Sequence, residues 1–314
     1  MYINATGHYV PEERVPNEKF LELNGLTSEW ILQRTGIRTR SKAGEGEGHN
    51  TMGLAAIRAA IEHLPYDVTD VDLIVSASYS PYDTVATLAH IAQREFGMEK
   101  ARAVYASAAC SSFVNGLEIV EGYFAMGKAT KALLVCSEHN TYYANETDRV
   151  CGHLWGDAAV AFFLSAERVA DTDMTVKTVY THGLGHIGKG PEGVRLRPHE
   201  DGIAMPFGKD VFMHACKNII NGLEQVTHAN GMEVADLDYI ICHQANMRIV
   251  ANVANTLGMG DDKFLNNIEE LGNTGSASSA LVFSQNVDKF RKGQHVGLSV
   301  FGGGYSVGAF LVEI

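Results

Sequence analysis

The stretch VTDVDLIVS, residues 68–76, occurs a second time in altered form as VADLDYIIC, residues 234–242. A second pair of segments lies the same number of residues apart in the sequence as the first pair. Gly127 precedes the apolar run ALLV, and Gly293 precedes VGLSVF. A constant offset of this kind indicates two halves of similar topology. Chance similarity between amphipathic α/β segments is the alternative explanation.

Apolar, β-rich runs alternate with helical periodicity along the whole chain, which is typical of layered α/β proteins. The pattern predicts strands at 71–78, 103–107, 132–137, 238–243 and 296–301, and a helix over 51–64. The polar stretch AERVADTDM, residues 166–174, predicts the boundary between the halves near residue 170. We therefore expect two units, 1–170 and 171–314, that pack together because no long linker separates them.

The composition is that of an ordinary soluble globular protein, with 46% hydrophobic and 20% charged residues among 314. The net charge of −12 and the lack of a Lys/Arg run argue against binding to nucleic acid. No apolar run approaches the roughly 20 residues of a membrane helix, and we see no signal peptide at the N-terminus. The five widely spaced cysteines form no CxxC pair, which favours reduced thiols in the cytoplasm.

Cys110 lies in YASAACSSFVNGLEIV, residues 105–120, where a short strand gives way to an amphipathic helix. The free N–H groups and the dipole at a helix N-terminus stabilise negative charge, so we expect the thiol to be shifted towards thiolate. The small neighbouring side chains would let a substrate carbonyl approach closely. The stretch therefore suits a nucleophile that accepts an acyl group, although a lone cysteine is more often a buried structural residue.

Three further turns carry polar or glycine-rich sequence directly after apolar segments. His243 ends a predicted strand, at the edge where open α/β sheets place their ligands. Asn273 lies in the turn GNTGS, and position 276 of this turn is related to Cys110 by the offset of the repeat. The run FGGG, residues 301–304, allows close backbone approach and exposes N–H groups that could face an oxyanion. If the halves are related by pseudo-symmetry, the Cys110 and Asn273 turns should meet near one axis.

The motifs AACSSF, WGD (155–157), HQANMRI (243–249), GNTGSAS (272–278) and FGGG occur in an order and spacing that resemble a known family. This family is β-ketoacyl-[acyl carrier protein] synthase III, of the thiolase superfamily. The N-terminal stretch TSEWILQRTGIRTR, residues 27–40, matches it as well, so the resemblance covers essentially the full chain. It implies an α/β fold, the thiolase-like five-layered αβαβα sandwich of two duplicated halves, normally as a homodimer. It implies no metal and no redox cofactor, with coenzyme A thioesters as substrates.

The resemblance also implies roles for individual residues. Cys110 would carry the acyl group as a thioester, and the backbone N–H groups of Cys110 and Gly303 would form an oxyanion hole over its carbonyl. His243 and Asn273 would hydrogen-bond the thioester carbonyl of a malonyl donor and stabilise the enolate that forms as CO₂ leaves. The resulting carbanion would attack the acyl-cysteine.

Binding residues are implied in the same way. The residues that match positions contacting coenzyme A or pantetheine in this family are Trp30, Arg34, Arg149, Gly208, Phe212 and Asn246. Trp30 and Arg149 would sandwich the adenine, and Arg34 would contact a phosphate. Arg248 matches one element of the basic surface that docks the acyl carrier protein. Other basic positions of that surface are Met213, Ala254 and Asn255 here, which leaves the carrier of the malonyl group open.

The expected activity is a decarboxylating Claisen condensation of an acyl group from acyl-CoA with malonyl-acyl carrier protein, in fatty acid or related lipid or polyketide synthesis. One alternative is a condensing enzyme of a secondary pathway, of the resorcinol or quinolone type. Others are a Cys-His-Asn thioester hydrolase and a non-catalytic partner subunit. The loop 80–90 would set the primer length by resemblance, with Tyr82 and Val85 lining the acyl pocket.

Overall fold

The computed structural model describes residues 1–314 and centres on a nine-stranded sheet with the order β11-β12-β13-β8-β1-β7-β6-β4-β5. The first half contributes β1 (Tyr2–Tyr9), β7 (Ala158–Ser165), β6 (Lys131–Glu138), β4 (Leu73–Ala77) and β5 (Arg102–Ala106). The second half contributes β8 (Met174–Gly183), β13 (Ser306–Glu313), β12 (His295–Gly302) and β11 (Tyr239–Cys242).

The two halves repeat one strand pattern. In the first half β1 is antiparallel to β7, β7 is antiparallel to β6, and β6 and β5 are both parallel to β4. In the second half β8 is antiparallel to β13, β13 is antiparallel to β12, and β12 is parallel to β11. A single parallel bridge from Phe264 to Ile240 occupies the place of the fifth strand. A short antiparallel pairing of β1 with β8 joins the two halves edge to edge.

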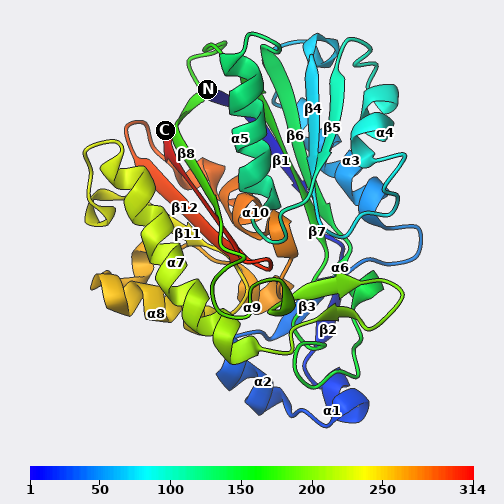
Figure 1. The fold of residues 1–314 in the computed structure, drawn as a ribbon. Coiled ribbons are helices and arrows are strands. Elements are labelled where there is room, and N and C mark those ends of the chain that lie inside the picture. Colours follow the sequence, from blue (N-terminus) through cyan, green and yellow to red (C-terminus); the bar gives the residue numbers. More distant parts are fainter.

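Helices complete a five-layered arrangement around the strands (Figure 1). In the middle layer, α5 (Ser112–Ala125) and α10 (Ser278–Gln285) contact strands of both halves. The outer helices of the first half are α3 (His49–Ile61) and α4 (Leu88–Glu95), and those of the second are α7 (Gly208–His228) and α8 (Met247–Leu257). The first residues of the two central helices are separated by the same offset as the repeated sequences. The predicted αβαβα sandwich of duplicated halves is confirmed.

Apolar burial on both faces of the central strands holds the layers together. All eight residues of β7, AAVAFFLS, are buried, as expected for a strand covered by helices on both sides. The largest apolar cluster lies between the two halves and includes Phe113 and Leu117 of α5 and Phe283 of α10. Separate clusters fill the spaces beneath α3 and beneath α7. None of the helices combines the length and the apolar character needed to cross a membrane.

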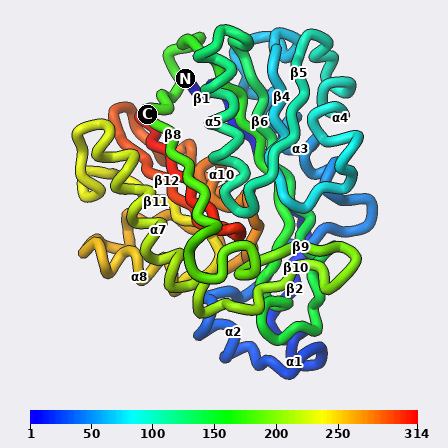
Figure 2. The backbone as a smooth tube through the Cα atoms, in the orientation of Figure 1, coloured from blue at the N-terminus to red at the C-terminus, as the bar shows by residue number.

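The predicted strands all exist, with ends that shift by one or two residues, and the helix predicted over 51–64 is α3. We place the boundary between the halves in the connection 166–173 between β7 and β8, and this boundary remains a proposal. Smaller elements gather at one end of the sandwich (Figure 2). They are β2 (Glu13–Pro16), α1 (Lys19–Asn24), α2 (Ser28–Thr35), β3 (Thr39–Lys42), α6 (Asn140–Tyr143), β9 (Arg195–Arg197), β10 (Gly202–Ala204) and α9 (Ile268–Leu271).

Candidate active site

Cys110 lies in the tight turn that leads from β5 into α5. The Ser111 hydroxyl donates to the Ala108 carbonyl at 2.8 Å, and the Ala108 N–H donates to Ser112 Oγ at 2.9 Å. Ala109 has φ +50°, in the left-handed region that is unfavourable for a residue with a Cβ. The serine side chains thus hold a strained turn in place, and Cys110, 8% exposed, follows the strained residue directly.

The environment of the Cys110 thiol differs from the sequence expectation. Burial, followed by the nearby Glu138 carboxylate, raises the pKa of the thiol to about 12. The backbone N–H groups of Gly303 and of Cys110 itself act in the opposite direction on this pKa. The expected shift towards thiolate is therefore wrong for the resting enzyme, because desolvation outweighs the favourable N–H groups at the start of α5.

The glycine-rich run after β12 packs directly against the cysteine. A Cβ at Gly302 would lie 2.7 Å from the Cys110 backbone nitrogen and 3.0 Å from its Cβ. A Cβ at Gly303 would meet the Val194 carbonyl oxygen at 2.9 Å. Because positions 302 and 303 carry no side chains, the Gly303 N–H can hydrogen-bond the Cys110 sulfur. The structure thus places Cys110 and Gly303 together, as an oxyanion hole requires.

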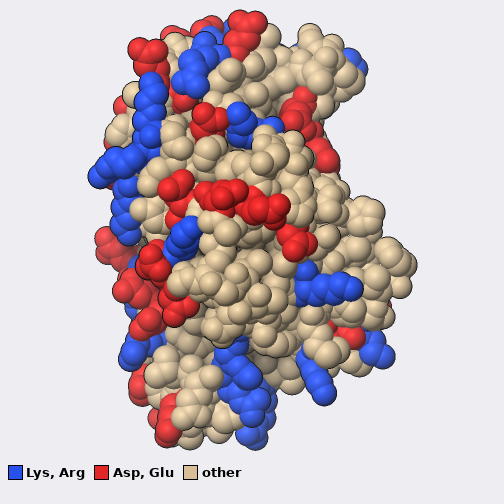
Figure 3. Space-filling view, turned by 90° about the vertical axis from the view of Figure 1, so that its left-hand side faces the viewer, with Lys and Arg blue, Asp and Glu red and all other residues tan.

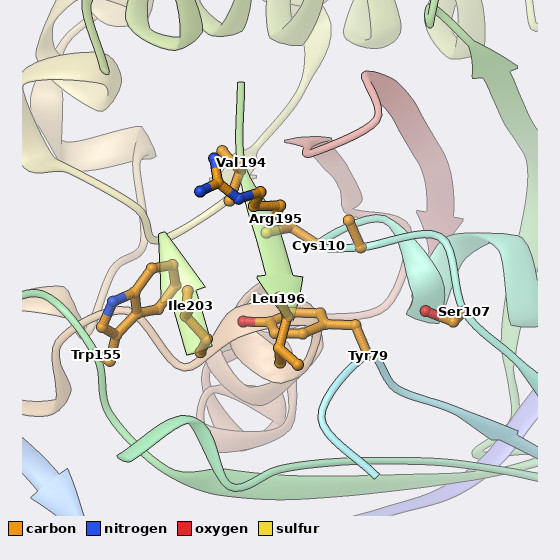
Figure 4. A pocket seen from close by; sticks show the side chains of 9 residues that line it. Tyr79, Ser107, Cys110, Trp155, Val194, Arg195, Leu196 and Ile203 are labelled. Atoms are coloured by element: carbon orange, nitrogen blue, oxygen red, sulfur yellow. The ribbon is translucent and has the colours of Figure 1, made fainter. Parts of the chain in front are cut away.

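A cavity of about 210 Å³ opens beside the cysteine (Figure 4). The residues that line it are Tyr79, Ser107, Ala109, Cys110, Trp155, Val194, Arg195, Leu196 and Ile203. These residues come from the segment after β4, from the turn between β5 and α5, from the WGD segment, and from the hairpin of β9 and β10 with the residue before it. Most of the lining is apolar, so the cavity suits a hydrocarbon chain attached to the sulfur.

His243 directly follows β11, as the sequence predicts. Its backbone N–H donates to the Ser299 carbonyl on the neighbouring β12 at 2.9 Å. Gly302, which touches Cys110, lies three residues further along β12, roughly 10 Å at the usual rise of a strand. His243 is 3% exposed, and burial lowers the pKa of its imidazole to about 4, so the ring is neutral near pH 7.

Asn273 pairs through its backbone with Trp155, which lines the Cys110 cavity. Its backbone N–H donates to the Leu154 carbonyl at 2.8 Å, and its carbonyl accepts from Gly156 at 3.0 Å, which brackets Trp155. Its side-chain Oδ1 accepts the Gly275 N–H at 3.0 Å. Because the amide oxygen accepts the Gly275 N–H, the amide NH₂ points away from Gly275. No protein group accepts from this NH₂, and it is not sealed from solvent.

A second cavity, of about 420 Å³, contains most of the residues matched to coenzyme A contacts. Trp30, Arg34, Gly208, Phe212, Asn246 and Arg248 all line it. Arg149 is not among the lining residues, and the guanidinium over the Trp30 ring is that of Arg34, at 5.2 Å. His153 packs edge-on against the same indole, with ring centroids 5.7 Å apart. The structure therefore does not bring Trp30 and Arg149 together as a stacking pair.

Charged side chains are unevenly spread over the face shown in Figure 3. Acidic residues form a band across its middle, and basic residues lie both above this band, along the upper left edge, and below it, at the end of the molecule that carries α2 (Figures 1 and 3). The basic residues that line the second cavity are Arg34, Lys209 and Arg248. The mouth of this cavity is thus locally basic in an acidic protein.

Sequence reasoning missed Glu138, the last residue of β6. It is fully buried and accepts the backbone N–H groups of Tyr79 at 3.2 Å and Ser80 at 3.1 Å. The hydroxyls of Ser80 and Ser276 donate to the same carboxylate. Burial raises its pKa to about 7 despite these donors. A Glu directly after the apolar run ALLVCS was the available signal, because a charge there must be buried.

The fold and the cysteine at the start of a central helix define the class, a thiolase-like condensing enzyme. A model of 3-oxoacyl-[acyl-carrier-protein] synthase III matches residues 106–183, and a model of the C-terminal part of that enzyme matches residues 227–314. The β-ketoacyl-[acyl-carrier-protein] synthase III of Rhodospirillum centenum is 32% identical over 320 residues, which cover 99% of this chain and 98% of that protein. The chain therefore belongs to the β-ketoacyl-[acyl-carrier-protein] synthase III family, and it is an acyltransferase.

Solved structures agree with this assignment. The 3-oxoacyl-[acyl-carrier-protein] synthase III of Aquifex aeolicus superimposes with a TM-score of 0.91 at 26% identity, covering 100% of this chain and 99% of that one. The priming β-ketosynthase of the R1128 polyketide pathway gives a TM-score of 0.90 at 28% identity, covering 99% and 95% of the two chains.

Proposed function

We propose that this enzyme transfers an acyl group from acyl-CoA to Cys110 and condenses it, with loss of CO₂, with a malonyl thioester. One observation carries the proposal: the Cys110 sulfur faces two backbone N–H groups beside an apolar cavity large enough for an acyl chain. The side-chain nitrogens His243 Nε2 and Asn273 Nδ2, on neighbouring elements, have no hydrogen-bond partner within the protein.

In the first half-reaction the Cys110 sulfur attacks the acyl-CoA carbonyl carbon. The carbon–sulfur bond to coenzyme A breaks, and the thiol proton leaves with the coenzyme A sulfur. The Cys110 and Gly303 N–H groups stabilise the oxyanion that forms on the carbonyl oxygen. A donor of this kind typically contributes about 3 kcal/mol to lowering the barrier. The acyl chain occupies the cavity lined by Leu196 and Ile203.

In the second half-reaction the malonyl carboxylate leaves as CO₂, and its bonding electrons move into the thioester as an enolate. The His243 and Asn273 N–H groups donate to the enolate oxygen. The resulting carbanion attacks the acyl-Cys110 carbonyl carbon, and the sulfur leaves with the bonding electrons. A neutral imidazole suits this role because it donates a hydrogen bond without protonating the enolate.

We propose malonyl-acyl carrier protein as the donor, with its pantetheine arm in the second cavity. Arg34 and Lys209 would attract the phosphates of coenzyme A, and Arg248 would attract an acidic carrier protein. With Arg248→Ala, we expect kcat/KM for malonyl-acyl carrier protein to fall at least fivefold, with little change for malonyl-CoA. Equal losses with both donors would reject carrier docking at Arg248.

The central experiment supplies radiolabelled acyl-CoA to the purified enzyme and then adds malonyl-acyl carrier protein. Wild type should retain one label on Cys110 and release β-ketoacyl product after the second addition. Cys110→Ala should retain none, and His243→Ala and Asn273→Ala should retain label but condense slowly. Label on wild type that turns over only to free acid would favour a thioester hydrolase and contradict the proposal.

One comparison also favours a role in polyketide synthesis. The R1128 priming β-ketosynthase is 28% identical over nearly the whole chain, about as similar as the Aquifex enzyme. The same chemistry could therefore prime a polyketide instead of a fatty acid. Mass spectrometry of the products formed with primers from acetyl to dodecanoyl, and with the carrier proteins of each pathway, distinguishes the two.

We further propose a homodimer, working in the cytoplasm. Tyr82 and Val85 do not line the Cys110 cavity, and they are 73% and 84% exposed. Tyr142, 68% exposed, lines an open groove together with Tyr82. Exposed aromatic and aliphatic residues in one region suit a contact with a second copy. Light scattering should give twice the 34.1 kDa mass of the chain, and a monomer would contradict the dimer.

The five free cysteines fit a reducing compartment such as the cytoplasm.

A further inference from the structure

A neutral imidazole carries one ring proton, and the nitrogen that carries it decides what His243 can do. To donate to an enolate oxygen through Nε2, the ring needs its proton on Nε2 and a lone pair on Nδ1. The chain must fix this choice through whatever contacts Nδ1.

The Nδ1 atom of His243 lies 2.8 Å from the hydroxyl oxygen of Ser278, the first residue of α10. Both side chains are buried, and Ser278 is 0% exposed. The backbone N–H of Gln244 also donates to the Ser278 hydroxyl oxygen, at 3.3 Å. This oxygen therefore already accepts a hydrogen bond from the backbone.

A serine hydroxyl has only one hydrogen to give. His243 Nδ1 is the one acceptor within hydrogen-bonding distance of Ser278 Oγ, because no backbone carbonyl or carboxylate competes for it. The Ser278 hydrogen must then point at Nδ1, which has to present its lone pair. The remaining ring proton is left on Nε2, and Nε2 has no protein partner and is not sealed from solvent.

The neighbouring Gln244 keeps this arrangement rigid. Its side-chain amide nitrogen donates to the Cys242 carbonyl at 2.8 Å, and its amide oxygen accepts the Asn267 N–H at 3.1 Å. Both ends of the amide are held, so the turn that presents the Gln244 N–H to Ser278 cannot easily shift. Asn273 is organised in the same way, with its oxygen held by Gly275 and its NH₂ free.

We propose that Ser278 is a positioning residue that fixes His243 as the Nε2–H tautomer, so that the imidazole donates to the malonyl thioester oxygen. The inference rests on the proposed function for its role in catalysis, but the tautomer itself does not. Ser278 touches no substrate and acts only through His243.

The test uses Ser278→Ala, with Ser279→Ala as the matched control. Ser279 is the next residue of the same helix, is equally buried, and its hydroxyl has no hydrogen-bond partner. In Ser278→Ala, condensation should slow roughly 10- to 100-fold, less than when an oxyanion donor is removed outright. Acylation of Cys110, measured by mass spectrometry in a single turnover, should stay within about twofold of wild type. Ser279→Ala should leave both steps near wild type.

A second readout is independent of activity. In protein labelled with ¹⁵N-histidine, the His243 signals, assigned by their absence in His243→Gln, should show the Nε2–H pattern in wild type. Ser278→Ala should show a mixture of both tautomers, and Ser279→Ala should not. An Nδ1–H pattern in wild type, or equal condensation rates in the two variants, would overturn the proposal. If wild-type Cys110 accepts no acyl group, the proposed function fails while the tautomer result still stands.

Discussion

At the scale of single residues, the site depends on backbone approaching backbone. Gly302 packs so closely on Cys110 that a Cβ would lie 2.7 Å from its nitrogen. Gly122, half-buried in the last turns of α5, has no neighbour within 4 Å of such a Cβ. The two glycines therefore offer a matched pair of substitutions.

We expect Gly302→Ala to displace the Cys110 backbone and to slow acyl-enzyme formation at least tenfold, with a stability loss of about 1–3 kcal/mol. Gly122→Ala should keep the rate and stabilise the helix by up to about 1 kcal/mol. Single-turnover acylation and thermal melts measure both. Normal acylation in Gly302→Ala would show that the close approach is not needed.

Glu138 is the other residue whose removal is informative, because its charge raises the pKa of Cys110. Glu138→Gln keeps the shape, but its single amide oxygen can accept only one of the two N–H groups, because Tyr79 donates to Oε1 and Ser80 to Oε2. The thiol pKa should fall by about one unit. The rate of Cys110 alkylation plotted against pH should therefore shift to lower pH. Glu118→Gln, on the exposed face of α5, should leave the profile unchanged, and an equal shift in both variants would contradict the assignment.

At the scale of elements, the hairpin of β9 and β10 closes the acyl cavity. Leu196 and Ile203 come from its two strands, and the cavity volume of about 210 Å³ corresponds to roughly seven groups of water size. Wild type should therefore prefer primers of up to about six to eight carbons.

Leu196→Ala enlarges the cavity and should move the optimum primer to a chain longer by about two to four carbons. The kcat/KM values for primers from acetyl to dodecanoyl measure the shift, with the conservative Leu196→Met as control. A lower rate with every primer and an unchanged optimum would mean that this hairpin does not limit chain length.

The elements that the sequence predicted best were those with buried, continuous apolar runs. Strands such as VDLIVSAS are recognisable because both faces are covered, and the repeat of this run later in the chain could be read without any structure. The sequence analysis left out four strands of the nine-stranded sheet, β1, β7, β8 and β13. In β1 buried residues alternate with half-buried ones, whereas β8 is mostly half-buried and β7 is buried throughout. The positions at which the strands before Cys110 and His243 end were predictable, since polar residues follow the apolar runs there.

Contacts between distant segments could not be predicted in the same way. Gly302, in the other half of the chain, packs against Cys110, and the burial of the thiol reverses the pKa shift expected from the helix N-terminus alone. The bond from Ser278 to His243 and the position of Arg149 outside the second cavity are likewise set by tertiary packing.

At the scale of the whole molecule, three buried histidines make stability depend on pH. Burial lowers the pKa values of His49, His153 and His243 to about 4 each. An unfolded histidine binds its proton near pH 6.5, so the unfolded state takes up more protons as pH falls below that value. Glu138 acts oppositely, because its raised pKa of about 7 favours the folded state as pH falls from 7 to 4.5.

Between pH 7 and pH 5 each histidine should cost about 2 kcal/mol, and Glu138 should return about 2 kcal/mol. We therefore expect the free energy of unfolding to fall by roughly 4 kcal/mol. Denaturant unfolding at fixed protein concentration across this range measures it, and His153→Leu should reduce the slope. A constant or rising free energy as pH falls would contradict these pKa shifts.

The burial of Cys110 also governs how the enzyme meets oxidants. Peroxide attacks thiolates, and a thiol that is 8% exposed with a pKa of about 12 offers almost none at neutral pH. We therefore expect sulfenic acid to form slowly at this sulfur between turnovers. An enzyme whose nucleophile stays protonated until a thioester arrives can survive oxidative stress that would inactivate a more reactive cysteine.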